Sequence, residues 1–298
     1  MKTIQEILTS GTAYLEARGI DAARHSMQSM LVHVLGCSKT WLYLHHDDPL
    51  AEDQLAPLRD MLRERGKGVP LQHLLGSTEF YRREFRTDAR ALIPRPETEE
   101  LVERALQMVH KQTGMRILDM GCGSGIIGIT LALELAAQKP EVVLADISDA
   151  ALALTLENAS TLGAKVRTYR SNLFSAWAPS PENPVVPPSE FDLVLANLPY
   201  VPDGEAVSAE VQHDPATALY GGPDGLDLVR RFLKDALPHL KDGCLVMLEV
   251  GHDQGETTRR IMKEYGYTDC RVLTDMSGKA RFPIGYAHHT KPEEPHHE

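Results

Sequence analysis

Residues 117–132 read ILDMGCGSGIIGITLA, which joins an apolar run, a glycine-rich turn and a second apolar run. The first run is typical of a buried strand, and the second is typical of a helix. Gly123, Gly125 and Gly128 satisfy the G-x-G-x-x-G pattern of a turn that binds a nucleotide between a strand and a helix. This stretch therefore predicts an α/β fold with a ligand at its first strand–helix turn.

Six further strands are expected after the first one, which we place at residues 115–120. In chain order they are 141–146, 165–170, 191–196, 243–250, 268–275 and 279–286. Helical stretches between the first five strands predict a parallel, doubly wound sheet that is covered on both faces. The last two follow each other without a helix and predict an antiparallel hairpin at the sheet edge. The proline-rich residues 178–190 are expected to form an exposed loop.

The N-terminal part of the chain has a different pattern, in which short helices are separated by Ser and Gly. Asp21 is the expected N-cap of one helix, and Gly36 is its expected end. Residues 77–94 begin with aromatic residues that alternate with charges, which indicates a β-hairpin. The sequence thus predicts a helical domain over 1–76, a hairpin linker over 77–94 and a ligand-binding domain over 95–298.

The composition, with 42% hydrophobic and 24% charged residues, is that of a globular protein. No apolar run could span a bilayer, and the N-terminus lacks the apolar core of a signal peptide, so we expect a cytoplasmic location. The four cysteines form no CxxC pair, and no HExxH occurs among the 13 histidines, so no metal is expected. The net charge of −11 argues against a nucleic-acid partner.

Two carboxylates near the glycine turn distinguish between candidate cofactors. Asp146 ends the second strand at the distance expected for a ribose ligand, which suits both NAD and S-adenosylmethionine. Asp119 lies two positions before Gly121, where its charge would repel a pyrophosphate but attract the ammonium group of S-adenosylmethionine. Capping of the following helix is the alternative role for Asp119. The residues favour S-adenosylmethionine, with NAD as the second candidate.

Asn197, Leu198, Pro199 and Tyr200 follow the fourth strand, where a doubly wound sheet places ligands. The Asn197 side-chain carbonyl and the Leu198 backbone carbonyl can accept both N–H groups of an amide or amine and orient its nitrogen for methylation. Pro199 restricts Leu198 to an extended conformation, and Tyr200 offers a flat wall for a planar group. We expect these four residues, which we call the tetrad, to be the catalytic and substrate-binding site. A proline turn that contains them by chance is the alternative.

These motifs resemble those of a known family. Residues 197–200 are similar to the (N/D)PPY motif of methyltransferases that modify amide or exocyclic amine nitrogens. LIPRPETEELVE, residues 92–103, resembles the PRPxTE segment of the release factor glutamine methyltransferases, the HemK/PrmC family. GVPLQHLLGSTEF, GGPDGLDLVRRFL and LEVGHDQG are also similar to that family. The resemblance extends from about residue 5 to residue 287.

The resemblance implies a seven-stranded, Rossmann-like class I methyltransferase sheet and a small helical domain that recognises the substrate. It implies transfer of a methyl group from S-adenosyl-L-methionine to N5 of the GGQ-motif glutamine in class-1 peptide-chain release factors, which act in translation termination. By position, it assigns the cofactor to Gly121, Cys122, Gly123, Ser124, Gly125, Asp146, Asn172, Leu173 and Asn197, besides Asp119.

Two departures from the family pattern stand out. Leu198 replaces the usual first proline but keeps the backbone carbonyl, and Asn172-Leu173 replaces the usual Asp-Trp beside the adenine, so we expect weaker adenine binding. The ribosomal protein L3 glutamine methyltransferase shares the tetrad and is the nearest alternative, although the PRPET segment favours release factors. An adenine-N6 DNA methyltransferase is disfavoured by the acidic charge, and a catalytically silent cofactor-binding interaction protein is disfavoured by the intact Asn197.

Overall fold

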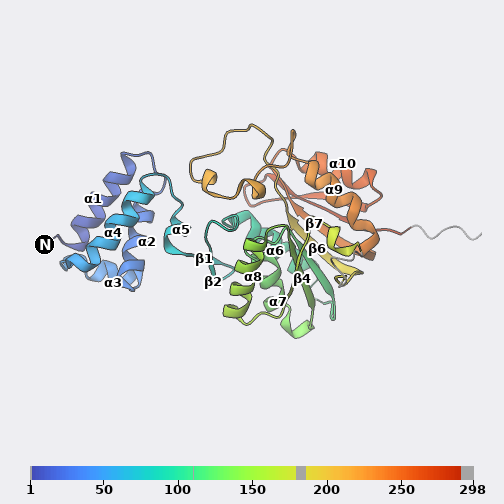
Figure 1. Ribbon diagram of the computed structural model, residues 1–298, viewed down its shortest axis with the longest axis horizontal. Coiled ribbons are helices and arrows are strands. Elements are labelled where there is room, and N and C mark those ends of the chain that lie inside the picture. Colours follow the sequence, from blue (N-terminus) through green and yellow to red (C-terminus); the bar gives the residue numbers. More distant parts are fainter. Residues whose placement is uncertain (1, 110, 179–185, 290–298) are drawn as a thin grey trace, which may run out of the picture. The chain divides into compact units, whose positions relative to one another are not determined.

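The computed structural model of the chain describes residues 2–109, 111–178 and 186–289 (Figure 1). The chain forms two compact units. The first unit consists of the residues up to 78, with residues 87–89 and 207–214. The second unit consists of residues 79–86, 90–206 and those from 215 onward.

The first unit is a small helical bundle. Its helices are α1 (Ile4–Glu16), α2 (Ala23–Leu35), α3 (Lys39–Leu44), α4 (Glu52–Arg65) and α5 (Leu71–Leu75). Met27, Met30 and Leu31 of α2 are fully buried in its core. α2 ends at Gly36, as expected, but its N-cap is Ala22 rather than Asp21, because the chain enters the helix through a left-handed Ala22.

Residues 207–214 belong to this first unit although they lie far along the chain. The guanidinium of Arg65 is buried and forms an ion pair with Glu210. Arg65 also donates to the Val69 carbonyl at 2.9 Å and to the Ser26 hydroxyl at 3.3 Å. A buried cation needs such partners because an unpaired charge in the interior is costly. Arg65 therefore anchors the segment to the helical bundle.

A two-stranded hairpin of β1 (Ser77–Phe80) and β2 (Arg83–Arg86) follows the helical bundle. Its two turn residues, Tyr81 and Arg82, both have positive φ angles, 49° and 61°. Two such residues match the right-handed twist of the flanking strands in a two-residue turn. The hairpin occupies residues 77–86 of the expected 77–94, and the residues from 87 to 94 form no strand.

The second unit is built on a seven-stranded sheet with the order β5-β4-β3-β6-β7-β9-β8. The strands are β3 (Arg116–Met120), β4 (Glu141–Asp146), β5 (Arg167–Arg170), β6 (Phe191–Asn197), β7 (Leu240–Glu249), β8 (Thr268–Thr274) and β9 (Ala280–Tyr286). Neighbours from β5 to β7 are parallel, whereas β9 is antiparallel to both β7 and β8. The predicted strands and the edge hairpin are confirmed.

Helices cover both faces of the sheet, as the sequence predicts. They are α6 (Pro96–Val109), α7 (Ile126–Glu134), α8 (Asp149–Leu162), α9 (Asp227–Ala236) and α10 (Gly255–Glu264). α9 and α10 lie on the opposite side of the sheet from α7 and α8 (Figure 1). Each face of the sheet has its own hydrophobic core, and alternate residues of a strand pack in different cores. Leu118 packs with residues of α9 and α10, whereas Ile117 packs with residues of α6 and α7. This alternation is the period of two expected for a strand.

Short 3₁₀ helices complete the described secondary structure. They are η1 (Ala136–Gln138), η2 (Ser175–Trp177), η3 (Val211–His213), η4 (Ala216–Ala218) and η5 (Leu237–His239). Between β5 and β6 the described residues contain η2 and no α-helix, which differs from the helix expected there. Most of the predicted proline-rich loop and of the C-terminal tail lies outside the described residues. Among those residues, no helix is both long and apolar enough to cross a membrane.

Candidate active site at the carboxyl ends of the strands

A cavity of about 410 Å³ lies in the second unit where β3, β4, β5 and β6 end. Its position follows from the topology. The chain winds from β3 to β4 on one side and returns to β6 on the other, and doubly wound sheets bind ligands at such a reversal. The volume is within the range of small-molecule sites. The cavity is therefore the candidate ligand site.

The glycine-rich turn forms one wall of this cavity through Gly121, Cys122, Gly123 and Ser124. Gly125 has a φ of 79° and caps α7, and a Cβ added there would lie 2.7 Å from Cγ2 of Thr155. A Cβ at Gly128 would lie 2.9 Å from Cγ of Leu144. Gly125 thus allows α8 to approach the turn, and Gly128 allows α7 to approach the sheet, which is the packing role of glycine in such motifs.

Most amides of the turn already have protein acceptors. The amides of Gly121 and Cys122 both donate to the Ala145 carbonyl, at 2.8 and 3.0 Å. Gly123 donates to a carboxylate oxygen of Asp146 at 2.9 Å, and Gly125 donates to the Cys122 carbonyl at 2.8 Å. A pyrophosphate cradle needs such amides to be available to the ligand. The turn therefore suits a cofactor without phosphates better than NAD.

Asp119, at the base of the turn, is fully buried and is not among the residues that line the cavity. Its Oδ2 accepts a hydrogen bond from the Gly128 amide at 2.8 Å, so it caps the first turn of α7. Its Oδ1 has no partner among the described residues. Burial raises the pKa of this carboxyl to about 7. The helix-capping role is thus present, with one carboxylate oxygen left over.

Asp146 ends β4 and lines the cavity. Its two oxygens hold the backbone on both sides, since Oδ2 accepts from the Gly123 amide and Oδ1 from the Ser148 amide, each at 2.9 Å. Each carboxylate oxygen has a further lone pair for a ligand. Asp146 therefore connects the glycine turn with the start of α8 at the cavity wall.

Asn172 and Leu173 follow β5 and also line the cavity. The Asn172 side chain is exposed, and its Oδ1 accepts a hydrogen bond from Arg231 at 3.4 Å. Leu173 has a positive φ of 51° and packs in the hydrophobic core with Phe174. Both residues thus line the cavity, and of the two side chains only that of Asn172 offers a polar group.

The tetrad begins at Asn197, the last residue of β6, and Asn197, Leu198 and Pro199 line the same cavity. Leu198 is buried against the glycine turn, since a Cβ at Gly121 would lie 3.0 Å from its Cδ2. Tyr200 is not among the lining residues, and the aromatic side chain in the lining is Tyr220. Burial raises the pKa of Tyr200 to about 12, and its carbonyl accepts from Gln254 at 2.9 Å.

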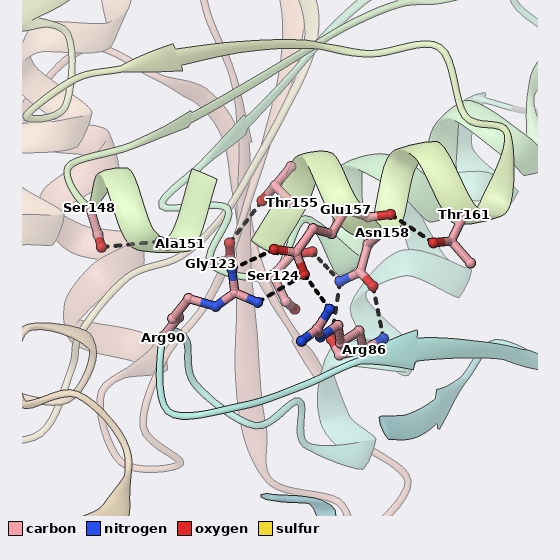
Figure 2. Close-up of polar contacts among 10 residues, drawn as sticks. All are labelled: Arg86, Arg90, Gly123, Ser124, Ser148, Ala151, Thr155, Glu157, Asn158 and Thr161. Atoms are coloured by element: carbon pink, nitrogen blue, oxygen red, sulfur yellow. Dashed lines mark hydrogen bonds and ion pairs between the residues drawn. The ribbon is translucent and has the colours of Figure 1, made fainter. Parts of the chain in front are cut away.

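Figure 2 shows that side chains of α8 form hydrogen bonds with the backbone of the glycine turn. Asn158 is buried, and its amide donates to the carbonyls of Ser124 at 3.0 Å and Arg86 at 3.1 Å. Its Oδ1 accepts from the Arg86 amide at 2.8 Å, and Thr155 donates to the Gly123 carbonyl at 2.9 Å. The buried Asn158 side chain therefore joins the glycine turn to the end of the β-hairpin.

Arg90 extends this arrangement to the cavity, which it lines. Its guanidinium forms a bidentate pair with Glu157 of α8, at 2.8 and 2.9 Å (Figure 2). Sequence reasoning missed both Arg90 and Asn158, because no motif shows which face of α8 meets the turn. It also missed the lining residues Ala91, Leu92, Pro94, Thr98, Ile147, Ser148, Leu228 and Arg231. Leu92, Pro94 and Thr98 lie in the quoted stretch 92–103, for which the sequence offered no chemical role.

The remaining candidate chemistry is limited. The four cysteines all carry free thiols. Within the part of the chain that the structure describes, no cluster of three or more His, Cys, Asp or Glu side chains could hold a metal. The cavity lining includes Asp146, Asn197 and the thiol of Cys122, whose pKa burial raises well above its ordinary value.

Two family models match the chain. Residues 6–76 match the PrmC N-terminal domain, and residues 101–217 match the methyltransferase small domain. Proteins named release factor glutamine methyltransferase are similar along nearly their whole length. The one from Koribacter versatilis is 32% identical over 95% of this chain and 98% of its own length. Those from Geobacter sulfurreducens and Bacillus subtilis are 35% and 33% identical, over 93% and 98% of this chain and 94% and 100% of their own lengths.

These matches confirm the expectation of a methyltransferase, with S-adenosylmethionine rather than NAD as its cofactor. The two family models cover the helical bundle and strands β3 to β6, whose ends surround the cavity. The chain belongs to the release factor glutamine methyltransferase family.

Proposed function

We propose that this enzyme methylates N5 of the glutamine in the GGQ motif of class-1 peptide-chain release factors. The observation that carries the proposal is one cavity that contains both the glycine turn and the first three residues of the tetrad. A methyl donor held at the turn and an amide held at the tetrad would share that space.

The residues around the glycine turn fit S-adenosylmethionine, which supplies an electrophilic methyl group on a sulfonium. Asp146 has lone pairs left to accept the ribose hydroxyls, and Asn172 presents a polar group at the end of β5. The unpartnered Oδ1 of Asp119 favours a cationic group nearby, because a positive charge would stabilise its ionised form. We assign these three residues to the ribose, the adenine and the ammonium group respectively.

The tetrad residues would hold and orient the substrate amide. The lone pair of an amide nitrogen is delocalised, so the nitrogen must be oriented and its developing positive charge stabilised. We propose that Asn197 Oδ1 and the Leu198 carbonyl accept its two N–H groups. The Asn197 Nδ2 already donates to Thr98, which leaves Oδ1 for the substrate. The Tyr200 side chain does not line the cavity. We propose that Tyr200 contributes to this site through its backbone, whose carbonyl accepts a hydrogen bond from Gln254.

We propose further that the helical bundle over residues 1–76 recognises the release factor, in the cytoplasm. Removal of these residues should leave affinity for S-adenosylmethionine intact, since the cavity residues all lie after residue 89. Methylation of intact release factor should be lost, because contacts remote from the reacting atoms position a substrate. Full activity of the shortened chain would mean that these residues serve another purpose.

The direct test is incubation of the purified enzyme with a release factor and isotope-labelled S-adenosylmethionine, followed by peptide mass spectrometry. One methyl group should appear on the GGQ glutamine. Ribosomal protein L3 and adenine-containing DNA, assayed in parallel, test the two enzymatic alternatives. Methylation of either one in place of the release factor would overturn the proposed substrate, and no methylation of any would favour a silent binding protein.

A further inference from the structure

Three polar side chains from three elements meet beside the cavity. Asn197 and Glu249 are register partners at the ends of the adjacent parallel strands β6 and β7. Thr98 lies in the first turn of α6 and lines the cavity. Thr98 and Glu249 are each only 2% exposed, whereas Asn197 is partly exposed. Glu249, which is not among the lining residues, therefore lies behind Thr98 and Asn197, which both line the cavity.

The hydrogen bonds among these residues have one direction. The Thr98 hydroxyl donates to Oε2 of Glu249 at 2.8 Å. A hydroxyl has a single proton, so after this donation it can only accept further hydrogen bonds. It accepts from Nδ2 of Asn197 at 3.4 Å. The opposite orientation of the Asn197 amide would place its carbonyl against an oxygen that has no proton to offer.

The hydrogen bonds to Glu249 agree with this direction, whereas the burial of its carboxyl group acts against it. Burial is the largest effect and raises the pKa of Glu249 to about 7, and side-chain hydrogen bonds with Thr98 and Asn197 oppose that rise. Among more distant groups, Glu97 of α6 raises the pKa and Arg281 of β9 lowers it. The hydrogen bond from Thr98 thus favours the ionised carboxylate, which is the form that only accepts.

We propose that Glu249 and Thr98 are positioning residues that hold the Asn197 side chain with its carbonyl directed to the substrate amide. This inference rests on the proposed function, because it assigns Asn197 Oδ1 to the substrate. It gives a positioning role to Thr98 in the stretch 92–103 and to Glu249 in LEVGHDQG. Both stretches resemble the family, but the sequence alone indicates no chemical role for them. The two residues act through Asn197 and need not touch the reacting atoms.

The first test is kinetic and uses a pair of substitutions at one position. Thr98→Val removes the hydroxyl while keeping the shape, and Thr98→Ser keeps the hydroxyl. With saturating release factor and S-adenosylmethionine, Thr98→Val should lower the single-turnover rate by about ten- to a hundredfold, the scale of a misplaced catalytic group. Thr98→Ser should remain within about threefold of wild type, and cofactor affinity should be unchanged in both variants.

A matched control is Thr258→Val in α10. Thr258 is also fully buried, and its hydroxyl has no partner among the described residues. Thr258→Val makes the same chemical change at a residue that does not line the cavity, so the methylation rate should stay at the wild-type value. A rate loss as large as that of Thr98→Val would mean that any buried Thr→Val change impairs the enzyme, which would overturn the proposal.

A double-mutant cycle separates positioning from structural support. In an Asn197→Ala background, Thr98→Val should cause no further loss of rate, because the group that it positions is absent. The same additional loss in both backgrounds would overturn the proposal. A wild-type rate for Thr98→Val alone would also overturn it.

The second readout needs no turnover. In ¹⁵N spectra of Asn-labelled protein, the side-chain amide of Asn197, assigned from its absence in Asn197→Ala, should shift and exchange faster with solvent in Thr98→Val. Thr98→Ser should restore the wild-type signal. An unchanged signal in Thr98→Val would overturn the proposal. If the wild-type enzyme fails to methylate a release factor, the proposed function fails, whereas this measurement still decides whether Thr98 holds the amide.

Discussion

Asp119 accepts a hydrogen bond from the Gly128 amide at 2.8 Å, so the carboxylate at the end of β3 caps the helix on the far side of the glycine turn. A Cβ at Gly128 would lie 3.1 Å from Cβ of Asp119, so the glycine permits this approach. This hydrogen bond joins the residues before and after the glycine turn in the interior of the second unit. The buried carboxyl group that we propose to attract the ammonium group of the cofactor therefore also caps α7.

The raised pKa of Asp119 predicts how stability depends on pH. Its ordinary value of 3.8 is raised by burial to about 7, so the folded ligand-free protein binds this proton more tightly than the unfolded chain. The stability that it contributes is complete below pH 3.8 and is lost as pH rises through about 7. The free energy of unfolding of wild type, relative to Asp119→Asn, should thus fall by more than about 1 kcal/mol from pH 5 to pH 8. Urea unfolding at both pH values measures this, and parallel pH profiles would contradict it.

Asp146→Ala should weaken the binding of S-adenosylmethionine by about ten- to a hundredfold, the scale of lost charge-assisted hydrogen bonds. The change also deprives the Gly123 and Ser148 amides of their acceptor. Titration calorimetry measures the affinity. The control is Asp149→Ala, which removes an exposed carboxylate at the start of α8 that pairs with Arg170 at the end of β5. Equal affinities for wild type and Asp146→Ala would remove Asp146 from the cofactor site.

The sequence predicted the strands and the glycine turn because both depend on local patterns. Buried parallel strands are continuous apolar runs, and the turn needs glycine where a Cβ would strike Thr155. Contacts between distant segments leave no such pattern. Arg65 and Glu210 pair across 145 positions, and neither is distinguished by its neighbours in the chain. Asp21 shows a different limit, since the left-handed Ala22 starts the helix without a side-chain cap.

Asn158 illustrates the same limit within the site, and it allows a sharp test. Asn158→Ala should lower the free energy of unfolding by about 2–4 kcal/mol, because the amide and carbonyl of Arg86 and the carbonyl of Ser124 lose their partner. Cofactor affinity should fall as well, since the glycine turn loses a support. Thr161→Ala in the same helix is the control, because that exposed hydroxyl bonds only to a carbonyl of its own helix. Denaturation and calorimetry report both effects, and similar values for the two variants would contradict the expectation.

Leu198→Pro should retain methylation within about tenfold of wild type, since the proposed chemistry uses only the backbone carbonyl of this residue. The leucine side chain packs against Gly121, so its loss should weaken cofactor binding slightly. Single-turnover rates at saturating cofactor separate the two effects. A collapse of the rate without unfolding would mean that the leucine side chain itself takes part in the reaction.

Asn197→Ala should leave folding and cofactor affinity nearly intact, because the side chain is only partly buried and faces the cavity. The methylation rate should nevertheless fall by about 10² to 10³, the scale of losing one preorganised hydrogen bond to the transition state. Asn197→Asp should also methylate the glutamine amide poorly, because a carboxylate cannot donate to Thr98 and would lie beside the Glu249 carboxylate. Thermal melting, calorimetry and single-turnover assays on a release factor test the three parts. A near wild-type rate for Asn197→Ala would remove this residue from the reaction, since no other change in the variant could restore the lost acceptor.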